Sequence, residues 1–237
     1  YRPDEYNIDH INNGKLVLLL YRITQKEKYL KAAKLLREQL RTHPRTKEGG
    51  FWHKAIYPYQ MWLDGLYMGA PFYAEYADLM HEDTAFNDIA NQFIWMEKHA
   101  RDAKTGLLYH AWDESKEQKW ANKETGVSPL FWARAMGWYA TALVDALDWF
   151  PEDHPGRKDL ISILNRLVTA VEKVQDPGTG LWLDILNYNG LGKEKNYFEA
   201  SASSQFVYAI AKGVRKGYLP AIKITIARKG NDGILKR

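Results

Sequence analysis

The sequence predicts an all-α protein built from stacked αα-hairpins, and three observations support this fold class. Apolar residues recur at three- and four-residue steps along most of the chain, which is typical of amphipathic helices. No set of short alternating runs bounded by turn residues indicates a β-sheet. Charged amphipathic helices alternate with smoother ones rich in Gly, Ala, Ser and aromatics, as expected for the outer and inner helices of a solenoid or a closed toroid.

The periodicity predicts helices over 10–22, 26–42, 56–80, 84–100, 128–150, 157–175, 199–217 and 219–230. Pro71 lies inside the third range and predicts a bend or a break there. Ser128-Pro129 is expected to start the fifth helix, because Ser is a common N-cap and Pro loses no hydrogen bond at the first helical position. Asp176-Pro177-Gly178 should stop the sixth helix and Gly217 the seventh.

A loose repeat supports the hairpin arrangement. Gly50–His53, Gly106–His110 and Gly180–Asp184 each follow a charged helix and precede a smoother one. The loops entering the smoother helices are long, and loops beyond about 12–15 residues usually carry function. They span 42–56, 100–128 and 175–199. Because the helices alternate in direction, all three loops should meet at one end of the molecule, where we expect the functional site.

Composition excludes several classes of protein. The chain has 237 residues and no cysteine, which rules out disulfides, zinc–thiolate sites, iron–sulfur clusters and a cysteine nucleophile. No apolar run reaches the ~18–20 residues that span a bilayer, and no signal peptide is visible, so we expect a soluble cytoplasmic or periplasmic protein with no membrane partner. The net charge is +4, but the basic residues concentrate in 26–47 and 212–237, while the aromatic-rich middle is acidic. Nucleic-acid binding is therefore not expected.

A carboxyl group follows a tryptophan in the run His110-Ala111-Trp112-Asp113. Apolar aromatic surroundings disfavour the ionised form of a carboxyl group and can keep it protonated near neutral pH, ready to donate a proton. Asp113 is therefore a candidate acid. The alternative is that Asp113 caps a turn, as many loop aspartates do, and these residues alone leave both readings open.

Asp64 lies in an unusually apolar run, 60–69, where a charged residue should face a partner or a cavity. The predicted helix would place Gln60 and Asp64 on one face, four residues apart. The alternative is a buried aspartate bonded to a neighbouring helix.

Arg134 and Trp138 are also four residues apart and share a predicted helix face. A guanidinium with an aromatic wall suits a carboxylated sugar. The alternative is a structural Arg–Asp pair beside a core tryptophan.

His53 and His110 occupy matching positions in two repeats. Without a short ligand motif such as His-Glu-x-x-His, hydrogen-bonding or core histidines are favoured over a metal pair. The sequence also lacks a serine nucleophile elbow and a phosphate-binding loop. We therefore expect neither a metal nor an organic cofactor.

Three stretches together go beyond generic patterning: 50–77 (GFWHKAIYPYQMWLDGLYMGAPFYAEYA), 106–151 (GLLYHAWDESKEQKWANKETGVSPLFWARAMGWYATALVDALDWFP) and 198–219 (FEASASSQFVYAIAKGVRKGYL). They resemble the unsaturated rhamnogalacturonyl hydrolases of glycoside hydrolase family 105, which are related to the unsaturated glucuronyl hydrolases of family 88. The resemblance implies an (α/α)6 barrel over residues 1–237 as a single catalytic domain. Such a barrel needs twelve helices and about eight are expected here, so the domain should be truncated at both ends.

The resemblance also implies a substrate and a mechanism. The substrate is a lyase-generated oligosaccharide, rhamnogalacturonan-type in this family, that ends in a Δ4,5-unsaturated uronic acid. An aspartic acid protonates C4, water adds at C5, and the resulting hemiketal rearranges with loss of the glycosidic bond. Asp113 matches the catalytic acid/base and Asp64 the second active-site aspartate. The implied substrate-binding residues are His53, Tyr57, Gln60, His110, Trp112, Arg134 and Trp138. Other readings are another (α/α)6 glycan hydrolase, a sugar epimerase, or a non-catalytic sugar-binding scaffold.

Overall fold

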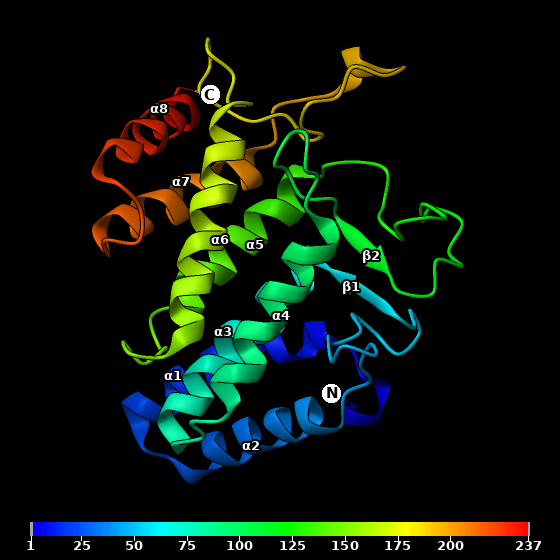
Figure 1. The fold of residues 1–237 in the computed structure, drawn as a ribbon. Helices are drawn as coiled ribbons and strands as arrows, with labels where there is room; N and C mark the ends of the chain where they lie inside the picture. The colour runs from blue at the N-terminus through cyan, green and yellow to red at the C-terminus, as the bar shows by residue number, and fades with distance from the viewer. Residues whose placement is uncertain (1, 237) are drawn as a thin grey trace.

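The computed structural model describes residues 2–236, which form an arc of two helical layers (Figure 1). Within these residues the α-helices are α1 (Gly14–Thr24), α2 (Glu27–Thr42), α3 (Leu63–Met80), α4 (Ala85–Ala100), α5 (Ala133–Ala146), α6 (Pro155–Glu172), α7 (Ala200–Arg215) and α8 (Ile224–Leu235). Short 3-10 helices span Pro3–Glu5, Ile8–Asn13, Lys193–Lys195 and Ala221–Lys223. All eight predicted helices are present, although their ends differ.

The predicted alternation of inner and outer helices is confirmed. The inner helices α1, α3, α5 and α7 contact one another in sequence, and each odd-numbered helix also packs on the even-numbered helix that follows it. Figure 1 looks onto α4 and α6, with α3 and α5 behind them. Helices α3 and α5 are buried over most of their length, because their Gly and Ala residues permit close approach on every side. The core between the layers includes Tyr139, Phe93 and Phe206.

The third predicted helix begins later than expected, so Gln60 and Asp64 do not share a helix face. Residues Gln60–Trp62 form strand β1, which pairs antiparallel with β2 (Ala111–Asp113). Tyr59, just before β1, adopts a left-handed conformation with φ 65°, which a continuous right-handed helix cannot contain. Pro71 does not break α3: the helix runs continuously to Met80, with Pro71 buried, so of the predicted bend or break the break was wrong.

The fifth helix also begins later than predicted. Ser128 does not cap it; its side chain accepts a hydrogen bond from the Ala111 amide at 3.1 Å, and its own amide donates to the Ala111 carbonyl at 2.9 Å. Ser128 thus attaches the loop 114–132 to β2, and α5 starts only at Ala133. Figure 1 shows the β1–β2 ribbon and the loops beside it on one side of the helices. In the described residues, no helix is both long and apolar enough to cross a bilayer.

Candidate active site

Asp64 and His110 form an acid–histidine pair where α3 meets the β-ribbon. Asp64 lies in the first turn of α3, and its Oδ1 is 3.0 Å from His110 Nε2. Burial would raise the pKa of Asp64. The hydrogen bond from His110 and the charges of His53 and His110 outweigh burial and hold that pKa below its ordinary value. A helix N-terminus also favours a negative charge at this position. The predicted site residues Asp64 and His110 are therefore brought together.

Trp62 contacts four of the predicted site residues. The rings of His53 and Tyr57 stack on its indole, with centroids 4.4 and 5.2 Å away and interplanar angles of 11° and 13°. Buried Gln60 accepts a hydrogen bond from Trp62 Nε1 at 3.0 Å. The edge of His110 also packs on this ring. Trp62 was not among the predicted site residues, although strand alternation from Gln60 places both side chains on one side of β1.

Asp9 is a second acidic residue at this site and was not predicted from the sequence. It lies in the 3-10 helix Ile8–Asn13, with its carboxylate 3.4 Å from His53 Nε2 and 2.8 Å from Lys54 Nζ. Burial lowers the pKa of His53, which favours the neutral ring. Asp9 precedes the first helix and lies in no recognisable motif, so only the fold brings it to His53.

Arg134 lies at the start of α5, beside a tryptophan and a buried glutamate. Its guanidinium lies over the Trp132 ring, 4.8 Å from the centroid, and its Nη1 is 3.2 Å from Glu199 Oε1. Trp132 is held in turn by a 3.0 Å hydrogen bond from its Nε1 to Asp184. The alternative reading of Arg134 as part of an ion pair is thus partly right, with a glutamate as the partner.

Trp138 lies one turn beyond Arg134 on α5. Its ring packs on Tyr67 of α3 at 4.4 Å between centroids. The helical spacing that places Trp138 and Arg134 on one face of α5 is therefore present, because both residues fall within a continuous helix.

A pocket of about 390 Å³ lies between Trp62 and Trp132. It is also lined by His110, Ala111, Trp120, Ser128, Pro129, Leu130 and Ile185. Three indoles in one pocket suit the apolar faces of sugar rings, and the volume falls within the range of small-ligand sites. Asp64 and Arg134 are not among the lining residues, but Asp64 contacts His110 and Arg134 lies over Trp132, and both of these partners line the pocket.

Asp113 and Trp112 do not line this pocket. The Asp113 side chain is fully buried: Oδ1 accepts from the Ser115 amide and hydroxyl at 3.0 and 2.7 Å, and Oδ2 from the Gln118 amide at 3.0 Å. Trp112 points to the opposite side of β2 and stacks on His99 at 3.7 Å. The Asp113 carboxylate is thus enclosed by its own loop, and its role as proton donor stays a prediction. The turn-capping alternative describes its contacts.

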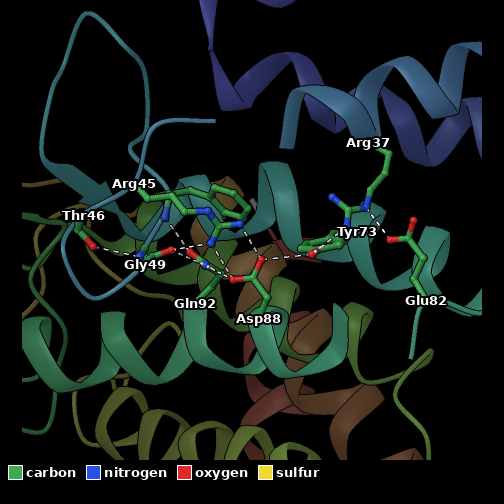
Figure 2. A network of polar contacts seen from close by, with 10 residues as sticks. Arg37, Arg45, Thr46, Gly49, Tyr73, Glu82, Asp88 and Gln92 are labelled. Carbon is green, nitrogen blue, oxygen red and sulfur yellow. Dashed lines mark hydrogen bonds and ion pairs between the residues drawn. The ribbon is translucent and has the colours of Figure 1, made fainter. Parts of the chain in front are cut away.

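A polar network clamps the loop that leads to His53 (Figure 2). Arg45 makes two 2.8 Å hydrogen bonds to Asp88 of α4 and one of 2.7 Å to the Gly49 carbonyl. Gln92 donates to Gly49 and to Asp88, and accepts from the Phe51 amide. The loop 43–52 is thereby attached to α4, which fixes the position of the following His53. Across residues 2–236, no three His, Asp or Glu side chains cluster in a way that could hold a metal ion.

Comparison with known proteins identifies the family of this chain. The family model described as Glycosyl Hydrolase Family 88 matches residues 2–237. The chain belongs to glycoside hydrolase family 88/105. A family 105 glycoside hydrolase structure from C. acetobutylicum superimposes with a TM-score of 0.96 at 53% identity, over 100% of this chain and 65% of that one.

Two further relatives match part of the chain. The unsaturated rhamnogalacturonyl hydrolase YesR of Bacillus subtilis is 30% identical over 210 residues, which are 86% of this chain and 57% of that protein. Protein Atu3128 of Agrobacterium fabrum is 40% identical over 152 residues, 64% of this chain and 63% of that protein. The chain thus spans less than two thirds of each of these relatives.

The family 88/105 chain is a partial (α/α)6 toroid. A cellobiose 2-epimerase from Bacillus thermoamylovorans shares the fold at 13% identity, with a TM-score of 0.73 over 60% of its length. The edge of the arc at α1 is open: Leu16, Leu19, Leu20 and Ile23 are 40–70% exposed along one face. A closed toroid covers both flanks of each inner helix, so this apolar stripe marks where the arc is unclosed.

Proposed function

We propose that this protein hydrolyses lyase-generated oligosaccharides, releasing the terminal Δ4,5-unsaturated uronic acid, with rhamnogalacturonan-type fragments as the preferred substrates. The observation that carries the proposal is one pocket of sugar size, flanked by an acid–histidine pair on one side and a half-exposed arginine on the other. Family membership and the name of the relative YesR support the same reaction. We expect the described residues to supply the catalytic part of the domain.

We assign the proton transfer to Asp64, because its partner His110 lines the pocket; Asp113, which matches the catalytic acid/base of the family, is the alternative donor. In the reaction, its carboxyl proton goes to C4 of the enol ether, and water bonds to the resulting cation at C5. The water proton returns to Asp64, so the residue is regenerated. The hemiketal at C5 opens the ring, and the hemiacetal left at C1 releases the next sugar. No displacement occurs at the anomeric carbon, so the two-carboxylate scheme of ordinary glycosidases does not apply.

The low pKa of Asp64 in the free protein is compatible with this role only if binding changes its surroundings. A bound sugar excludes water from the carboxyl group, and a uronate adds a like charge nearby. Both effects favour the protonated acid. His110, which contacts Asp64 directly, is placed to orient the proton.

Arg134 would bind the uronate carboxylate, because a guanidinium pairs with a carboxylate through two parallel hydrogen bonds. Trp62 and Trp132 would cover the apolar faces of the sugar rings. His53, Tyr57 and Gln60 contact Trp62 and so support its position.

The direct test is activity on oligosaccharides made by a polysaccharide lyase. Turnover removes the double bond, so the ultraviolet absorbance of the substrate falls with time. The matching saturated oligosaccharides should not be cleaved, which separates this reaction from an ordinary glycan hydrolase. An inactive protein across pectic, glycosaminoglycan and algal lyase products would refute the proposal.

A further inference from the structure

Glu199 is a buried carboxylate at the N-cap of α7, only 6% exposed. Its two oxygens accept from the Ser201 hydroxyl, both at 2.8 Å, and Oε2 also accepts from the Ala202 amide. These donors and the positive end of α7 stabilise its negative charge without any help from Arg134. The carboxylate is therefore a fixed group to which a mobile side chain can attach.

Arg134 is such a side chain. The Arg134 side chain is 40% exposed, whereas the Glu199 side chain is 7% exposed. Among residues 2–236, Glu199 is the one acceptor that the guanidinium of Arg134 contacts. The Trp132 ring restrains the plane of the guanidinium, and Glu199 restrains one edge. These two contacts hold the planar guanidinium of Arg134 in one orientation. Its remaining N–H groups can then donate to a ligand.

We propose that Glu199 is a positioning residue that orients Arg134 and so determines the preference of this site for a ligand with a free carboxylate. The proposal deepens the proposed function and rests on it, because it takes the ligand to be the uronate end of the substrate. Glu199 itself does not touch the sugar. Without it, Arg134 keeps its charge but loses the restraint on its fork, which weakens a bidentate contact more than a nonspecific attraction.

The experiment measures binding, so that it does not depend on turnover. Two lyase-generated disaccharides are compared by calorimetry, one with a free carboxylate on the unsaturated uronate and one with its methyl ester. The parent is Asp64→Asn, which should bind without cleaving. Adding Glu199→Gln keeps an oxygen that can accept from the Ala202 amide. We expect it to weaken binding of the free acid about tenfold and to change binding of the ester by less than about twofold.

Glu82→Gln is the matched control, because Glu82 also pairs with arginines, Arg37 and Arg41, none of which lines the pocket. Figure 2 shows its contact with Arg37. It should leave the ratio of the two affinities unchanged. In an Arg134→Lys background, Glu199→Gln should have no further effect on that ratio, because lysine has no fork to orient.

Equal weakening of acid and ester by Glu199→Gln would overturn the positioning role while leaving the proposed function intact. A parent protein that binds neither disaccharide would overturn both.

Discussion

Replacing Asp64 and Asp113 separately by asparagine tests which of the two is the proton donor. The Asp64 side chain contacts His110, which lines the pocket, and asparagine preserves its size. Loss of a general acid typically lowers kcat by 10²–10⁴, so we expect a fall of about 1,000-fold, equivalent to about 4 kcal/mol. Because the amide can still bond to His110, the free energy of unfolding should change by less than about 1 kcal/mol.

Asp113→Asn should behave in the opposite way. Its two oxygens accept three hydrogen bonds from Ser115 and Gln118 in a fully buried position. An amide keeps one oxygen, so its NH₂ must face at least one buried donor, which costs about 1–3 kcal/mol. For a chain of this size, that lowers Tm by on the order of 5 °C. We expect kcat of the folded protein to stay near that of the wild type.

The assays are the fall in ultraviolet absorbance for kcat and thermal or urea unfolding for stability. Asp176→Asn is the matched control, because Asp176 caps a similar turn with all three donors on Oδ1, which asparagine retains. It should cost less than Asp113→Asn. If Asp113→Asn abolishes turnover at normal stability while Asp64→Asn stays active, the assignment argued from the geometry is wrong.

Two further predictions concern stability. Burial lowers the pKa of His43 to about 4 from 6.5 and outweighs the hydrogen bond to the Trp52 carbonyl, which acts in the opposite direction. Protonation would also bury an unpaired N–H at Nδ1. The unfolded chain binds this proton first, so the free energy of unfolding should fall by up to about 3 kcal/mol as pH drops from 6.5 to 4. The His43→Gln variant should lack this part of the pH dependence when unfolding by urea is measured at several pH values. Asp88→Asn breaks the two-bond contact with Arg45 and should lower the free energy of unfolding by about 2 kcal/mol. It should also speed amide hydrogen exchange in residues 45–53, and unchanged exchange would contradict the attachment of this loop to α4.

Much of the fold follows from local pattern. Each of the eight helices could be predicted from apolar spacing, and the alternation of charged and smooth helices predicted which ones lie inside. The boundaries were less predictable. The early starts expected for α3 and α5 were wrong because residues 60–62 and Ser128 make hydrogen bonds to β2, and such cross-chain pairing leaves no periodic signal.

The site, like the fold, was predictable from the sequence only in part. By itself the sequence determined the fold class, the family resemblance and the loops that hold the pocket, because these depend on residues close together in the chain. The contacts of Asp64 and Asp113, the proximity of Asp9 to His53, and the attachment of Arg134 to Glu199 were decided only by the tertiary structure. The physical reason is that a carboxylate's function depends on which donors and charges surround it, and those neighbours come from distant segments.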